Sequence, residues 1–151
     1  MALDTGDAVV KWSGWVAVES SGSSISAGAM SSAATSECSS TNHLDAPLLE
    51  IGISAEFGAN TPTEGARVEV YAKINTIGGT ASNDGNVPTT THKHVCLGAA
   101  TLKAVAGTQY LHIGPIPLPS KEFDTYLFNG DPNDAMTWKL YIRPRSTNGL
   151  A

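Results

Sequence analysis

Charge, cysteine and long apolar runs are all scarce in this chain of 151 residues. Asp, Glu, Lys and Arg make up 15% of it, against roughly 25% in average soluble proteins. Acidic residues outnumber basic ones by 14 to 9. Because no cluster of Lys and Arg occurs, the sequence does not support a surface for nucleic acid or anionic lipid. The low content of charged residues also argues against disorder driven by like charges.

The opening stretch and the two cysteines bear on where the chain is made. MALDTGDAVVKWSG carries two aspartates where a secretory signal needs positive charge followed by a long apolar run. No apolar stretch approaches the length of a membrane-spanning helix, about 18 residues or more. We therefore expect a protein made in the cytoplasm, with no membrane partner. There, Cys38 and Cys96 are expected to be reduced and buried.

Strict alternation of apolar and polar residues is present, whereas helical periodicity is nearly absent. The alternation is clearest in 48–57, 66–74 and 136–144. It predicts strands with one buried face. The positions expected to face the core are Leu49, Ile51, Ile53, Ala55, Phe57, Val68, Val70, Ala72, Ile74, Met136, Trp138, Leu140 and Ile142. The intervening positions include Tyr71, Tyr141 and Arg143, which we expect on outer faces.

Several further segments are extended in character, which gives seven or eight strands in total. The dense Gly, Pro, Asn and Asp content of 129–134 predicts a tight connection between two strands. Pro144 is expected to end the last strand, since proline cannot donate to a ladder. We predict an all-β fold, one antiparallel β-sandwich domain over residues 1–151, with a jelly roll as the preferred version.

Two longer segments break the strand rhythm. Residues 20–40 are low in complexity and rich in Ser and Ala, and residues 75–91 are polar without a core pattern. Loops of that length in a compact domain are usually functional or mobile. We expect a flexible segment at 20–40 and a long polar loop at 75–91, both of them adaptable contact elements.

The stretch THKHVC, residues 91–96, places three metal-ligand residue types at every second position: His92, His94 and Cys96. A His-x-His pair resembles the first motif of cupin metalloenzymes. However, Gly98 and Ala99 stand where that family needs a glutamate, and its second motif is missing. The preferred interpretation is a strand flanked by two surface histidines, with Cys96 packed as a small apolar group. A metal site at these residues remains the alternative.

Other catalytic patterns are weaker still. Glu122 and Asp124 alternate onto one face of a predicted strand, which is more typical of solvated surface charge than of glycoside chemistry. Residues 131–134 resemble the opening of a calcium loop, but the glycine and the terminal glutamate are missing. No nucleophile elbow and no phosphate-binding loop with its lysine occurs. We expect no enzymatic activity and no cofactor.

Aromatic residues point to contact surfaces rather than to chemistry. Exposed tyrosines on a sheet are typical of a carbohydrate platform or of a protein interface. The candidate interface residues are Trp12, Trp15, Tyr71, Tyr141 and Arg143.

The last third of the chain resembles small β-rich structural proteins of tailed-bacteriophage virions. The resemblance covers residues 115–146 and lies in the order of segment types, with no diagnostic motif. It consists of a proline-rich crossing at 115–119, an aromatic strand at 123–128, an Asn/Asp/Gly turn at 129–134 and a closing strand at 138–144. It implies a virion protein, made in the cytoplasm of a bacterial host, that decorates or cements the capsid, or belongs to a tail or fibre.

Three functional hypotheses follow. The first, which the resemblance favours, is a capsid decoration protein that binds the major capsid protein through multivalent contacts as a homo-oligomer, a trimer or dimer. The second is a tail or fibre module that binds a glycan or receptor. The third is a cupin-like metalloenzyme. The sequence leaves open the placement on the particle, the partner, the host and the strand order.

Overall fold

The computed structural model describes residues 8–12, 14–38, 47–75, 77–78 and 85–149. Of residues 8–12 and 146–149 only the backbone is described. The strands are β1 (Ala8–Trp12), β2 (Val16–Ile25), β3 (Leu48–Glu56), β4 (Arg67–Ile74), β5 (Cys96–Thr101), β6 (Thr108–Pro117), β7 (Phe123–Asn129) and β8 (Met136–Gly149). The described residues contain no helix, and so none that is long and apolar enough to cross a membrane.

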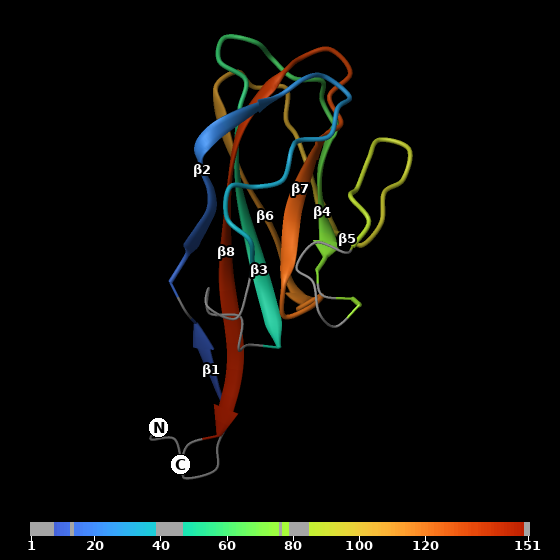
Figure 1. Ribbon diagram of the computed structural model, residues 1–151. Helices are drawn as coiled ribbons and strands as arrows, with labels where there is room; N and C mark the ends of the chain where they lie inside the picture. The colour runs from blue at the N-terminus through green and yellow to red at the C-terminus, as the bar shows by residue number, and fades with distance from the viewer. Residues whose placement is uncertain (1–7, 13, 39–46, 76, 79–84, 150–151) are drawn as a thin grey trace, which may run out of the picture.

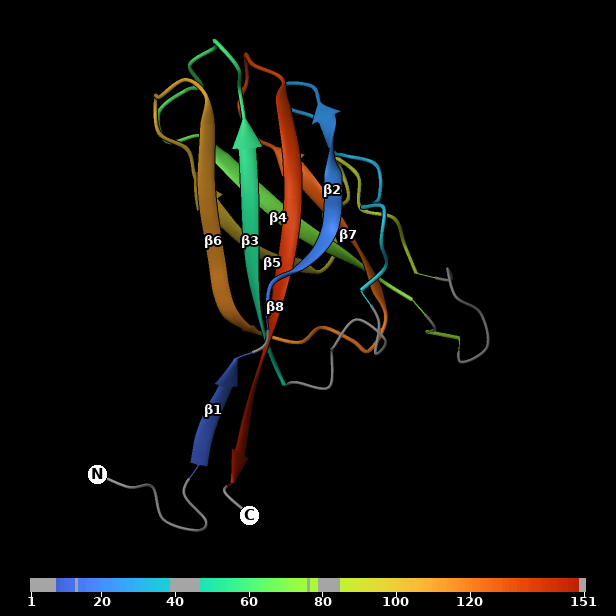
Figure 2. The ribbon, with the colours of Figure 1, turned by 90° about the vertical axis from the view of Figure 1, so that its left-hand side faces the viewer.

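The strands form two antiparallel sheets that pack face to face (Figure 1). In the first sheet, β8, β3 and β6 lie side by side, and β1 and β2 pair in succession along the free edge of β8 (Figure 2). The second sheet has the order β5-β4-β7. The predicted all-β sandwich is confirmed.

The connection between β2 and β3 supplies a fourth position in the second sheet. Met30 bridges to Phe128 and Cys38 bridges to Phe123, so this connection runs antiparallel along the edge of β7. With it, the sheets read β2-β8-β3-β6 and 30–38-β7-β4-β5. This interleaving of eight extended segments between two sheets is the strand order of a jelly roll.

The core lies between the sheets and is built from the alternating positions. Twelve of the residues expected to face inward are buried, and Ile74 is half-buried. Burial raises the pKa of the Cys38 thiol to about 12, so this cysteine is an apolar core group as expected. Cys96, in contrast, is exposed, which contradicts the expected packing as a small apolar group.

Two predictions about strand limits were wrong. Residues 20–25 of the Ser/Ala-rich segment belong to β2, and 30–38 hydrogen-bond along β7. β8 runs past Pro144 to Gly149. Pro144 lies between the end of the β2 pairing at Ile142 and the start of the β1 pairing at Arg145. Along the edge of β8 that pairs with β1 and β2, the missing N–H of Pro144 therefore removes no hydrogen bond of the ladder.

An arm of two strands leaves the sandwich. β3 pairs with β8 only as far as Arg145, whereas β1 pairs with β8 from Arg145 to Gly149. Figure 2 shows this arm (residues 8–12 and 145–149) extending away from the sheets. No described residue pairs with the outer edge of β1, or with the second edge of residues 146–149.

The predicted tight connection at 129–134 joins β7 to β8 and is organised by one buried carboxylate. Asp131 is fully buried and accepts hydrogen bonds from the backbone N–H groups of Thr63, Asn133 and Asp134. Because its oxygens face N–H donors, they are not arranged for a cation, and the site is a polar turn. Burial alone raises the pKa of Asp131, but these donors outweigh burial and hold the pKa below its ordinary value.

Replacing Asp131 with Ala should lower the free energy of unfolding by about 3 kcal/mol, because three backbone N–H groups lose a buried, charged acceptor. A group with a lowered folded-state pKa stabilises above its unfolded pKa, and that stability is lost as pH falls through the folded pKa. The difference between wild type and Asp131→Ala in urea unfolding should therefore narrow in acid. Asp134→Ala is the matched control. An equal loss in both variants would contradict this role of Asp131.

Candidate functional site

A concave aromatic site lies on the outer face of the first sheet. We call it the Trp15 groove; its volume is about 400 Å³, and its lining residues are Trp15, Gly52, Ile53, Ser54, Tyr110, Leu111, His112 and Tyr141. They come from β3, β6, β8 and the segment just before β2. Strand pairing aligns these residues across the sheet: Gly52 of β3 stands opposite both His112 of β6 and Tyr141 of β8. Two residues further along β3, Ser54 stands opposite Tyr110 of β6.

The position of Trp15 depends on a glycine and an arginine. A Cβ atom on Gly52 would lie 3.2 Å from the nearest carbon of the indole, so the ring rests on the backbone of β3. The Arg143 guanidinium carbon lies 4.5 Å from the ring centre, a cation–π contact. Trp15 is still 44% exposed, so its ring is fixed at the surface rather than withdrawn into the core.

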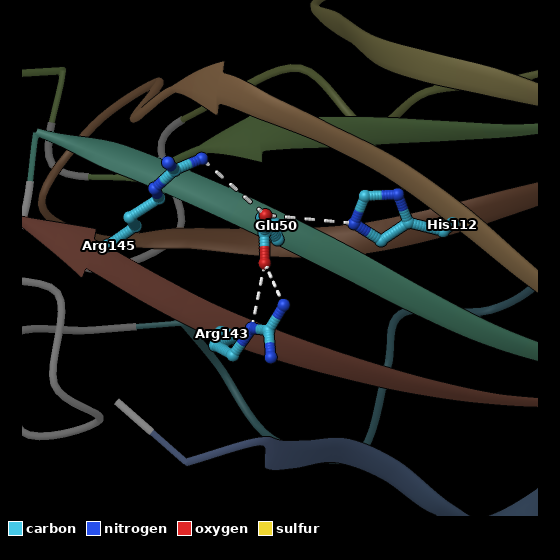
Figure 3. A network of polar contacts seen from close by, with 4 residues as sticks. All are labelled: Glu50, His112, Arg143 and Arg145. Atoms are coloured by element: carbon cyan, nitrogen blue, oxygen red, sulfur yellow. Dashed lines mark hydrogen bonds and ion pairs between the residues drawn. The ribbon is translucent and has the colours of Figure 1, made fainter. Parts of the chain in front are cut away.

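A cluster of charges borders the groove (Figure 3). The Glu50 carboxylate, in a buried residue of β3, accepts hydrogen bonds from Nε (2.7 Å) and Nη2 of Arg143. Arg145 Nη1 lies 3.8 Å from Glu50 Oε1, and His112 Nε2 lies 3.9 Å from the same oxygen. We call these four residues the Glu50 cluster. Since Arg143 contacts both Glu50 and Trp15, the buried carboxylate orients the residue that holds the indole.

Three of the five predicted interface residues meet at this site: Trp15, Tyr141 and Arg143. The side chain of Trp12 lies outside the described residues. The fifth, Tyr71, was expected to be exposed and is only 4% exposed.

Tyr71 does point away from the core, but the chain before β5 covers it. Val95 accepts a hydrogen bond from the backbone N–H of Ala72, and Lys93 lies over both Tyr71 and Phe128. The Tyr71 hydroxyl donates to Glu69. Burial and this carboxylate raise the pKa of Tyr71. It is therefore a packed residue of the second sheet and not part of an open surface.

The expected pair of surface histidines at the start of a strand is confirmed, because His92 and His94 are exposed just before β5, although residues 91–95 are not themselves strand. β5 begins only at Cys96, and His92 and His94 lie in the preceding loop with ring centres 6.2 Å apart. Thr89 Oγ1 accepts a hydrogen bond from the His92 backbone N–H, which closes a local turn. Among the described residues no three His, Cys, Asp or Glu side chains are grouped to hold a metal ion. The structure therefore offers no support for the cupin-like alternative.

Sequence reasoning missed Gly52, Tyr110 and His112. Alternation puts Gly52 on the outer face of its strand, but a glycine gives no sign that an indole rests on it. Tyr110 is 85% exposed and lies two residues from His112 on the same face of β6, so both could have been assigned to an outer face. The register between β3, β6 and β8, which brings them to Trp15, is not encoded in any one segment.

The arrangement has the features of a ligand-binding site. Its lining consists of aromatic rings, a backbone floor and a few hydroxyl and imidazole groups. The buried Glu50 carboxylate beside it is held by Arg143.

Replacing Arg143 with Ala should lower the free energy of unfolding by about 2 kcal/mol, because the buried Glu50 carboxylate loses two hydrogen bonds. Trp15 should also become more accessible to acrylamide quenching, since its stacking partner is gone. Arg143→Lys retains the charge but lacks the planar guanidinium fork, so its stability and its quenching should lie between those of the wild type and Arg143→Ala. Unchanged quenching in Arg143→Ala would show that this contact does not hold the indole.

Comparison with known proteins yields no match for this chain. No protein-family model, no curated protein and no solved structure matches it. What the protein does is therefore inferred from its sequence and from the arrangement of its described residues.

Proposed function

We propose that this chain is a non-enzymatic structural protein of a bacteriophage virion, of the capsid decoration or cement type. The observation that carries the proposal is the arm formed by β1 and the end of β8. The virion-like style of residues 115–146 supports it, and so does the jelly-roll strand order, an architecture that viral capsid domains share with lectins and cupins.

The arm has the physical character of an attachment element. A two-stranded ribbon without further packing is marginally stable in water. The edges of the arm that no described residue pairs with present backbone N–H and C=O groups, which a strand of another protein can extend by β-augmentation. An arm that leaves the sandwich is therefore completed by a partner, and the proposed partner is the major capsid protein.

Stabilisation of a shell needs no chemistry under this proposal. A decoration protein that binds the assembled shell and not its free subunits favours the assembled state by mass action. Several arms on one homo-oligomer, a trimer or dimer, would engage neighbouring coat subunits at once and raise the effective affinity. The protein then resides in the virion.

The copy number of the chain in purified particles tests the placement. Quantitative mass spectrometry should give a ratio to the major capsid protein near one, or a simple fraction such as one third. A handful of copies per particle would place the chain in the tail or fibres instead. Its absence from the particle would overturn the virion proposal as a whole.

Removal of residues 1–11 tests the arm directly. The truncated chain should lose binding to undecorated particles in a sedimentation assay, because β8 loses its partner from Ser146 to Gly149. Its thermal midpoint should stay within about 2 °C of that of the full chain, since the removed pairing lies outside the sandwich. Val105→Ala, a change at an exposed residue of the β5–β6 connection and outside the Trp15 groove, is the matched control. Unimpaired binding by the truncated chain would refute attachment by the arm.

A second candidate, a tail or fibre binding module, is favoured by the Trp15 groove. It would use the same fold with a different placement on the particle.

A further inference from the structure

We propose that the Trp15 groove binds a short oligosaccharide. The proposal does not depend on where the protein sits in a particle, because it rests on the groove alone. It differs from the sequence-based expectation of a platform at Tyr71 and Tyr141, since Tyr71 is buried on the other sheet. Only Tyr141 of that pair lines the groove.

The size of the groove fits a small ligand. About 400 Å³ falls within the 300–1,000 Å³ that is typical of small-molecule sites. A stable protein interface buries roughly 800 Å² on each partner. The described outer face around the groove also carries the Glu50 cluster and Lys139, which interrupt its apolar surface.

The aromatic lining fits the apolar face of a pyranose ring. The C–H groups on one face of a sugar pack on aromatic rings, while its hydroxyls remain at the edges. Trp15, Tyr110 and Tyr141 supply rings from three separate elements. Tyr110 is the most exposed of the large apolar side chains described, at 85%, so its ring is available to a ligand from solution.

Polar groups stand among the rings and are available to sugar hydroxyls. Within the described part of the chain, no hydrogen bond is made by the side-chain hydroxyls of Ser54, Tyr110 or Tyr141. His112 is half exposed, and its Nε2 lies 3.9 Å from Glu50 Oε1. A lining that combines aromatic faces with unpaired hydroxyls matches an amphipathic ligand better than a purely apolar one.

The groove is preorganised, which lowers the entropic cost of binding. The strand pairing of β3 with β6 and β8 fixes the backbone positions of Tyr110, His112 and Tyr141. Gly52 and Arg143 fix Trp15. Ligand stacking then needs no rearrangement of the backbone.

The test is binding of the full chain to immobilised oligosaccharides, followed by NMR titration of trisaccharides of β-1,4-glucose, α-1,4-glucose and β-1,4-N-acetylglucosamine. We expect at least one sugar to bind. Trp15→Leu, which keeps an apolar side chain without a ring, should weaken it by about tenfold. Trp15→Phe should retain most of the affinity. Tyr110→Ala should weaken binding, and Val87→Ala, an exposed apolar residue of the loop before β5, should not.

Each result either supports or overturns binding of the oligosaccharide in the Trp15 groove. Binding that is lost in Trp15→Leu and kept in Trp15→Phe, with the same thermal midpoint in both, supports stacking in the groove. Equal loss in Trp15→Leu and Val87→Ala would overturn the site, as would equal binding by all variants. A flat response of the wild-type chain to the whole panel would overturn it too. The particle copy number is unaffected by these results, so the two proposals fail separately.

Discussion

The register of β8 against β3 is the constraint on which the rest of the molecule depends. In this register Trp138 stands opposite Ala55 and Leu140 opposite Ile53, and all four side chains are buried between the sheets. A slip by one residue would turn the core positions outward and bury the charged ones. The same register brings Arg143 opposite Glu50, so core packing and the geometry of the groove are fixed together.

Alternation within a strand was enough to predict much of the fold. The stretches 48–57, 66–74 and 136–144 became β3, β4 and β8, with the predicted faces inward. Local pattern works there because each strand has one buried face, and burial of that face is the main driving force. The turn at 129–134 was also predictable, because Asn, Asp, Pro and Gly favour turns through their own backbone preferences.

What failed depends on residues far apart in sequence. Tyr71 faces outward as predicted, yet the loop that carries Lys93 buries it. Residues 20–25 look like a linker by composition, but pairing with β8 makes them strand. The groove is the extreme case: Trp15 rests on Gly52, and Tyr110 and Tyr141 flank it from opposite neighbours of β3. Single residues in three strands gave no joint signal until the sheet order was known.

The course of β8 also gives the molecule a polarity. Its first residues lie at the end where the β3–β4 and β5–β6 connections gather, and its last residues lie at the tip of the arm (Figure 2). Residues 58–61 and 63–65 of the β3–β4 connection are exposed. A foreign peptide inserted there is carried outward, at the end farthest from the arm. Under the proposed attachment through the arm, a tag joined beyond β1 or β8 would instead emerge beside the partner and compete with it.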